Sequence, residues 1–353
     1  MEPIRSGSST VYFGGDAIDA LRADLDRGGF SRVFVLTDSN TREHCLPVFL
    51  KWDPALADAI HLSMPAGEAH KNLDTCRRLW EELSEYGADR KSLLINLGGG
   101  VVTDLGGFVA CTYQRGISFV NVPTTLLAMV DASVGGKTGV DLGVLKNQVG
   151  VIRDPDLVGI YPGFLETLES RQVRSGFAEM LKHGLIQDRA YWEALSSLAG
   201  LDTLETHIHH SVQIKNRVVT ADPLEKGHRK ILNYGHTLGH AIESCFLDSD
   251  SAEPMLHGEA IAIGMVLEAY LSVQTCGLPR EACDQIKTTI LKFFPRVALA
   301  PALRDRVMQL LRFDKKNAHG KVLFSLLPDI GQAEIDQEVA VDHILDAFDY
   351  YAR

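Results

Sequence analysis

The sequence lacks an apolar run long enough to cross a membrane. A membrane-spanning helix needs about 20 consecutive apolar residues, whereas the most apolar stretch, LLINLGGGVVTDLGGFVA from Leu93, is interrupted by glycines and by Asp104. The opening residues MEPIRSGSSTVYF contain no apolar core of a secretory signal. We therefore expect a cytoplasmic protein that does not associate with membranes.

Cysteine is sparse, and basic residues are outnumbered by acidic ones. Six cysteines are scattered over 353 residues without a CxxC pair, which argues against a disulfide framework or a zinc knuckle and for reduced thiols. The net charge of -11 argues against a nucleic-acid partner, because binding a polyanion requires a basic surface. A small anionic substrate remains compatible with this charge, since a few lysines in one cleft suffice.

The chain is long enough for two domains, and its periodicity changes near residue 170. Apolar, β-branched runs alternate with a helical pattern in the first half, which predicts a parallel sheet. The expected strands are 32–37, 92–97 and 118–122, with a helix at 72–86. Residues 170–294 are helical in pattern, followed by a short strand near 321–327 and a helix near 339–348. We expect an α/β domain at 1–169 and a mainly α-helical domain at 170–353.

Three glycines, Gly98-Gly99-Gly100, follow the second expected strand and precede a helix expected to begin near Thr103. Glycine at this position lets the backbone approach a pyrophosphate, and a helix N-terminus favours its negative charge. The GxGxxG fingerprint is missing, so a tight turn without a ligand is the alternative. Asp38, in the turn after the first expected strand, is either a contact for ribose hydroxyls or a solvated turn residue.

Histidines and a glutamate in the second half suggest a metal site. His236 and His240 are four residues apart on one helix face. His257 follows about twenty residues later, and Glu179 lies in an earlier helix. Imidazoles with a carboxylate suit zinc or cobalt. A single HxxxH pair is more often a surface or core feature, but three histidines in apolar helical surroundings favour a metal. HExxH is absent, which disfavours a metallopeptidase.

Cationic residues recur in apolar or glycine-rich surroundings, which suggests a recessed anion site. Each of them taken alone is more often an ordinary solvated side chain. They are Lys137, Lys146, Lys182, Lys215, Arg229 and the pair Lys315-Lys316.

Six segments together resemble the 3-dehydroquinate synthase family over nearly the whole chain. They are GGGVVTDLGGFVACTYQRG, VPTTLLAMVDASVGGKTGVDLGVLKNQVG, GFAEMLKHGLI, RKILNYGHTLGHAIE, LHGEAIAIGM and DKKNAHGK. The resemblance implies a Rossmann-like NAD-binding domain followed by a helical domain that binds metal and substrate. It also implies a homodimer.

The resemblance carries family roles onto matching positions of this sequence. It implies a Zn²⁺ or Co²⁺ ion held by Glu179, His236 and His257. The implied NAD contacts are Asp38, Glu68, Lys71, Gly99, Gly100, Asp104, Thr124, Thr125, Lys137 and Lys146. The implied substrate site comprises Asp131, Lys137, Asn147, Lys182, Lys215, Arg229, Asn233, His240 and one of Lys315 or Lys316, with Lys316 preferred. Arg115 would reach the site of the neighbouring subunit.

The implied reaction converts 3-deoxy-D-arabino-heptulosonate 7-phosphate, a phosphorylated sugar acid, into 3-dehydroquinate and phosphate. It proceeds by transient oxidation with NAD, phosphate elimination, re-reduction, ring opening and aldol closure. Alternatives are another sugar phosphate cyclase, a metal-dependent polyol dehydrogenase and a non-catalytic binding protein. The last would be expected to lose metal or lysine positions, and this sequence keeps them.

Overall fold

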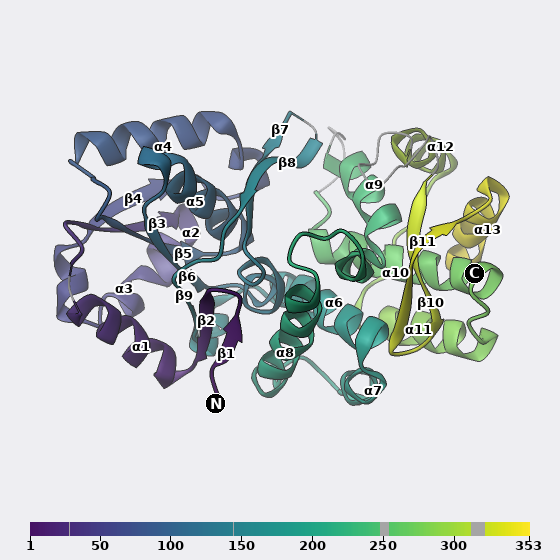
Figure 1. Ribbon diagram of the computed structural model, residues 1–353. Helices are drawn as coiled ribbons and strands as arrows, with labels where there is room; N and C mark the ends of the chain where they lie inside the picture. The colour runs from purple at the N-terminus through teal and green to yellow at the C-terminus, as the bar shows by residue number, and fades with distance from the viewer. Residues whose placement is uncertain (28, 144, 248–253, 312–321) are drawn as a thin grey trace. The chain divides into compact units, whose positions relative to one another are not determined.

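A seven-stranded sheet lies at the centre of the first of two units into which the described chain divides (Figure 1). The computed structural model describes residues 1–27, 29–143, 145–247, 254–311 and 322–353. The first unit comprises 1–169 and 205–220, and the second comprises 170–204 and 221–353. Residues 205–220 thus group with the first unit, although they lie in the stretch that the sequence pattern assigns to the second domain.

The order of the strands creates a reversal in the middle of the sheet. In spatial order they are β1 (Ile4–Ser6), β2 (Ser9–Phe13), β9 (Leu157–Ile160), β6 (Ser118–Pro123), β5 (Leu93–Gly98), β3 (Val33–Asp38) and β4 (Ile60–Met64). All neighbouring pairs are parallel except β1 with β2. The chain passes from β3 outward to β4 and returns to β5 on the other side of β3. In sheets of this kind, ligands bind at the carboxyl ends of the strands beside such a reversal.

Helices cover the sheet, which explains why strand β5 is buried along its whole length. All six residues of β5 are buried, as expected for a parallel strand with both faces covered. Helices α4 (Leu73–Glu85) and α5 (Gly100–Thr112) share one apolar cluster with β3, β4, β5 and β6. Helix α1 (Gly15–Asp26) packs against β2 and β9.

The remaining elements of the first unit are short connections, one hairpin and one long helix. The connections are α2 (Ser39–His44), α3 (Leu46–Phe49), η1 (Pro54–Asp58), η2 (Glu68–His70), η3 (Tyr113–Arg115), η4 (Ala128–Ala132) and η5 (Pro162–Thr167). The hairpin consists of β7 (Lys137–Leu142) and β8 (Leu145–Ile152), and the long helix is α8 (Glu205–Ala221).

The second unit is built around one buried helix, α10 (His257–Thr275). Because it is apolar on all sides, it can be surrounded by other elements, and it contacts α6, α9, α11, α13 and β10 (Figure 1). The elements of this unit are α6 (Ser170–Gln187), α7 (Arg189–Ser197), η6 (His228–Asn233), α9 (His236–Leu247), α11 (Arg280–Phe293), α12 (Pro301–Leu310), β10 (Leu323–Asp329), β11 (Gln332–Glu338) and α13 (Val341–Ala352).

The predicted α/β and mainly helical halves are confirmed. The sequence pattern located some of the strands and missed others. The three expected strands appear as β3, β5 and β6, each within one residue of the predicted limits. The sequence pattern missed β1, β2, β4, β7, β8, β9 and β11, which are short or half exposed and so lack a continuous apolar run. Helix α5 begins at Gly100 rather than near Thr103.

All six cysteines are free thiols. No helix among the described residues is long and apolar enough to cross a membrane.

Candidate functional site

The residues expected to contact NAD follow the carboxyl ends of four adjacent strands. Asp38 ends β3, Gly99 and Gly100 follow β5, and Thr124 and Thr125 follow β6. Glu68 and Lys71 come after β4, in and beside η2. The sheet order β6-β5-β3-β4 therefore brings these positions to one edge of the first unit. This edge includes the reversal between β3 and β5, where such sheets bind ligands.

The glycines at this edge let the chain turn sharply into α5. A Cβ atom on Gly98 would lie 2.5 Å from Cβ of Val102, and one on Gly99 would lie 3.0 Å from Cγ2 of Thr125. Gly99 is the N-cap of the 13-residue helix α5 and provides no side-chain cap. The first backbone amides of the helix are thus directed toward the strand edge, which suits a bound pyrophosphate.

Asp38 has a structural role that the sequence pattern did not reveal. Its Oδ1 accepts hydrogen bonds from the backbone N–H of Thr41 at 2.8 Å and from the hydroxyl of Thr41 at 3.0 Å. It therefore caps α2 in a reciprocal capping box. Capping fixes the carboxylate at the end of β3, next to the glycine turn.

Lys71 is the centre of a buried polar cluster in the first unit. Its side chain is 4% exposed, and its Nζ donates to Oδ2 of Asp104 and to Oδ1 of Asn147, both at 2.7 Å. Burial lowers the pKa of Lys71, but the charges of Asp104, Glu68 and Asp141, with the hydrogen bond to Asp104, together outweigh it and raise that pKa. Burial also raises the pKa of Asp104, although Lys71 opposes that shift. The ammonium group therefore joins an expected cofactor contact to an expected substrate contact.

Asp141, which sequence reasoning missed, holds the β7–β8 hairpin in register with this cluster. Its backbone N–H donates to the carbonyl of Lys71 at 2.8 Å, and its Oδ1 accepts from the N–H of Asn147 at 2.7 Å. Asn147 has a φ of 51°, which asparagine tolerates better than most residues. On the same hairpin, Nζ of Lys146 lies 3.5 Å from Oε1 of Glu68. Lys137 begins β7 and is exposed.

Lys215 of α8 is paired with Asp131 of η4. Its Nζ lies 2.7 Å from Oδ1 of Asp131 and also donates to the backbone carbonyl of Asp131 at 2.5 Å. Because both residues belong to the first unit, this pair explains how a helix that is late in the sequence brings a cation to the sheet domain.

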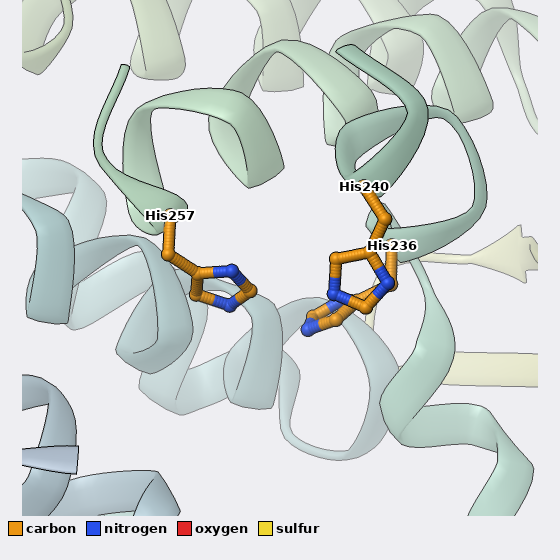
Figure 2. Close-up of side chains that lie close together, drawn as sticks. All are labelled: His236, His240 and His257. Carbon is orange, nitrogen blue, oxygen red and sulfur yellow. The ribbon is translucent and has the colours of Figure 1, made fainter. Parts of the chain in front are cut away.

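Glu179, His236 and His257 converge in the second unit. Oε1 of Glu179 lies 3.4 Å from Nε2 of His236 and 3.5 Å from Nε2 of His257. Glu179 is fully buried at 0% exposure. Figure 2 shows that His257 and His236 come from different helices and that His240 lies beside His236. One imidazole nitrogen from each of the three histidines lies within 4.8 Å of the corresponding nitrogens of the other two.

These residues fit a divalent ion of the zinc type. Two ligand atoms that are each about 2.0–2.1 Å from a tetrahedral ion are about 3.3–3.4 Å apart, close to the 3.4 and 3.5 Å found here. One carboxylate and two imidazoles are a common donor set for zinc and leave positions open for substrate. Lys182, which is 1% exposed, forms an ion pair with Oε2 of Glu179 and so supports the ionised carboxylate.

The outer nitrogens of both imidazoles are also engaged. Nδ1 of His236 lies 3.0 Å from the carbonyl of Tyr234, and Nδ1 of His257 lies 3.3 Å from Oε2 of Glu243. Burial would lower the pKa of His257, but the charges of Glu243 and Glu179 and their hydrogen bonds to the ring together outweigh it and raise the pKa to about 9. The site therefore favours positive charge at this ring, whether a proton or a metal ion supplies it.

Helix α10 is fixed closely against α6, which carries Glu179. A Cβ atom on Gly258 would lie 2.0 Å from the carbonyl oxygen of Ser175, so only glycine fits there, and the N–H of Gly258 donates to Oγ of Ser175 at 2.9 Å. Arg171 donates two hydrogen bonds to Glu259, at 2.7 and 2.8 Å. These contacts set the position of His257 relative to Glu179.

The other expected substrate residues of the second unit lie in and around η6. Arg229 is 2% exposed, and its guanidinium donates to the carbonyl of Pro223 at 2.8 Å. Asp222 accepts hydrogen bonds from the N–H groups of Gly227 and Arg229, which lower the pKa of this carboxyl group. Asn233 donates to Glu225 at 3.1 Å. Lys315 and Lys316 lie outside the described residues.

Solved structures define the class of protein to which this fold belongs. A 2-deoxy-scyllo-inosose synthase, solved with carbaglucose-6-phosphate, NAD⁺ and Co²⁺, matches with a TM-score of 0.83 and 25% identity over 98% of both chains. The 2-epi-5-epi-valiolone synthase from Streptomyces hygroscopicus subsp. jinggangensis, solved with NAD⁺ and Zn²⁺, matches with a TM-score of 0.81 and 25% identity, over 100% of this chain and 99% of that one. The fold is that of the sugar phosphate cyclases.

Sequence comparison identifies the family within that class. Profiles of the N-terminal and C-terminal parts of 3-dehydroquinate synthase match residues 61–175 and 176–317. The 3-dehydroquinate synthase of Parabacteroides distasonis is 42% identical over 327 residues, which are 91% of this chain and 92% of that protein. The chain belongs to the 3-dehydroquinate synthase family.

Proposed function

We propose that this protein converts 3-deoxy-D-arabino-heptulosonate 7-phosphate into 3-dehydroquinate and phosphate, a step of the shikimate pathway to aromatic amino acids. The observation that carries the proposal is the 42% identity over 91% of the chain to a 3-dehydroquinate synthase. The buried Glu179, with two histidine nitrogens at 3.4 and 3.5 Å, supplies the metal ligands that this chemistry needs. The cofactors are NAD and a divalent ion, zinc or cobalt.

In this proposal the first unit binds NAD and the second binds the metal ion. The carboxyl edge of the sheet, with Gly99 and Gly100 at the start of α5, would hold the pyrophosphate. NAD, when bound, would supply a hydride acceptor that returns the same hydride later in the cycle. Glu179, His236 and His257 would hold the ion, which lowers the pKa of an alcohol that touches it.

The chain's own residues would mainly bind and orient the substrate. Lysines 137, 182 and 215, with Asn147 and His240, would hold its phosphate and hydroxyl groups by charge-assisted hydrogen bonds. Arg229 would bind the carboxylate, because a planar guanidinium can donate two parallel hydrogen bonds. Such orientation matters, since a misplacement of about 1 Å can reduce the rate by about 100-fold.

Substrate choice tests the proposed reaction directly. With NAD and zinc or cobalt present, the protein should release phosphate from heptulosonate phosphate, while glucose 6-phosphate and sedoheptulose 7-phosphate, which lack the carboxylate, should react poorly. NADH should not accumulate during turnover, because each oxidation is followed by a reduction. Faster cyclisation of either sugar phosphate would assign the chain to another cyclase activity, and stoichiometric NADH would indicate a polyol dehydrogenase.

Arg229 is expected to determine the preference for a carboxylate. Losing a buried charge-assisted hydrogen bond costs at least about 2 kcal/mol, which is about 30-fold in binding. Arg229→Ala should therefore reduce kcat/KM toward heptulosonate phosphate by about 30-fold or more, and Arg229→Lys should recover only part of it. Steady-state kinetics on both variants measure this effect. Unchanged kcat/KM in Arg229→Ala would remove Arg229 from the substrate site.

We also propose that the working species is a cytoplasmic homodimer, in which Arg115 completes the site of the partner subunit. Arg115 is exposed in a turn where Gln114, Arg115 and Gly116 have φ values of 48°, 68° and 115°. Arg115→Ala should weaken substrate binding and leave NAD binding unchanged, whereas Arg90→Ala, at another exposed arginine, should change neither. Sedimentation of the dilute protein and cell fractionation test the assembly and the location. A fully active monomer would contradict the dimer.

A further inference from the structure

Glu243 is a buried carboxylate to which the family resemblance assigns no role. It lies on α9, three residues after His240 and seven after His236, so these three side chains share one face of the helix. Glu243 is 3% exposed. Burying an ionised carboxylate is unfavourable unless it has a hydrogen-bond or charge partner, so its contacts indicate what it does.

Glu243 contacts the imidazole of His257. Oε2 of Glu243 lies 3.3 Å from Nδ1 of His257, while Nε2 of the same ring lies 3.5 Å from Oε1 of Glu179. An ionised carboxylate only accepts hydrogen bonds, so Nδ1 must carry the hydrogen. In the neutral ring, the lone pair is then on Nε2, which is the nitrogen directed at Glu179.

The second histidine has an equivalent arrangement that uses the backbone. Nδ1 of His236 lies 3.0 Å from the carbonyl of Tyr234, and Tyr234 is itself anchored by a hydrogen bond from its hydroxyl to the carbonyl of Met265 at 2.8 Å. Both rings thus present Nε2 to the same carboxylate oxygen. Metal-binding histidines commonly have such an outer acceptor, which fixes the tautomer and the orientation of the ring.

We infer that Glu243 is a positioning residue that fixes the ring orientation and tautomer of His257 so that Nε2 is available to the metal ion. This inference rests on the proposed metal site and adds a residue to it. His236 obtains the same support from the main chain, so Glu243 is the outer acceptor that a substitution can remove. The carboxylate acts through His257 and does not itself touch the ion or the substrate.

Cobalt binding tests this role independently of turnover. Metal-free wild-type protein and the variants Glu243→Ala and Glu243→Gln are titrated with Co²⁺ in the presence of a competing chelator, and the visible absorption of the bound ion is recorded. Loss of an outer acceptor weakens metal binding by about 10- to 100-fold. We expect that loss and an altered Co²⁺ spectrum in Glu243→Ala. A smaller loss is expected in Glu243→Gln, whose amide oxygen can still accept from Nδ1.

Two controls separate this role from general damage to the fold. Ser244→Ala, the next position on α9, should keep the wild-type affinity and spectrum, and NAD affinity should be the same in all variants. Should Glu243→Ala fail to fold, the affinity and spectrum of Glu243→Gln decide the matter.

Wild-type affinity and spectrum in Glu243→Gln and in any folded Glu243→Ala would overturn the inference. Equal losses in both variants with an unchanged spectrum would also overturn it, since the lost charge alone would then be responsible. Failure of the wild-type protein to bind Co²⁺ would instead refute the proposed metal site.

Discussion

Replacing Glu179 with glutamine should greatly reduce turnover and release the metal ion. Glu179 is 0% exposed and is the only one of the three proposed ligands that carries a negative charge. A metal ion contributes several kcal/mol to such a reaction, and about 1.4 kcal/mol corresponds to a factor of ten in rate. The loss in kcat should therefore reach about 1,000-fold. Metal content by elemental analysis and phosphate release together measure the outcome.

The charge of Glu179, rather than its shape, is what this substitution tests. Glutamine has nearly the same volume, but it leaves the buried ammonium group of Lys182 without its carboxylate partner. Glu193→Gln makes the same chemical change at an exposed position on α7. It should leave metal content and turnover unchanged. Treatment of the wild-type protein with a chelator should mimic the Glu179 variant, and added Zn²⁺ or Co²⁺ should restore activity. Retained metal and turnover in Glu179→Gln would show that the ion binds elsewhere.

Periodicity revealed the strands that carry longer buried apolar runs and missed those that are short or partly exposed. Strand β5 is buried at all six positions and was predicted to within one residue. The hairpin β7–β8 has an exposed second strand, so its sequence carries little apolar signal. The grouping of α8 with the sheet unit depends on long-range contacts such as Lys215 with Asp131. Sequence spacing contains no information about such contacts.

The candidate site shows the same division between local and long-range information. Spacing placed His236 and His240 on one helix face, and the residue pattern already suggested His257 and Glu179 as further ligands. The family resemblance then implied Glu179, His236 and His257 as the ligand set. Neither identified the roles of Glu243 and Asp141, because these depend on which atoms meet after folding. Glu243 had a detectable signal, since it continues the face of His236 and His240 by one turn. Asp141 had none, since its role depends on the left-handed backbone of Asn147.

Replacing Lys71 with methionine should destabilise the sheet unit and weaken NAD binding. Methionine has a similar length but cannot donate to Asp104 and Asn147, each now 2.7 Å from Nζ. Removing one partner of a buried ion pair costs about 3–5 kcal/mol, because the remaining charge is left uncompensated. The lower end, about 3 kcal/mol, applies here, because the side chain of Asp104 is still 20% exposed. Denaturant unfolding and NAD titration measure the two effects.

The pH dependence of stability in the Lys71→Met variant shows whether the Asp104 carboxylate, left without Lys71, causes the loss. Burial already raises the pKa of Asp104, and Lys71 opposes that shift, so the pKa should rise further when the lysine is lost. A carboxyl group whose pKa is higher in the folded than in the unfolded state binds more protons when folded, and its unfavourable effect on stability grows as the pH increases. The stability difference between variant and wild type should thus be smaller at about pH 5 than at about pH 8.

A second substitution distinguishes the effect of the uncompensated Asp104 charge from the effect of lost packing. Replacing both members of a buried pair with apolar groups of similar volume is often nearly neutral. Adding Asp104→Leu to Lys71→Met should therefore restore most of the lost stability and remove the pH dependence, while NAD binding stays weak because both proposed contacts are gone. If the double variant is as unstable as Lys71→Met at every pH, the cost arises from packing or from Asn147. The ion pair would then contribute little to the stability of this edge of the sheet.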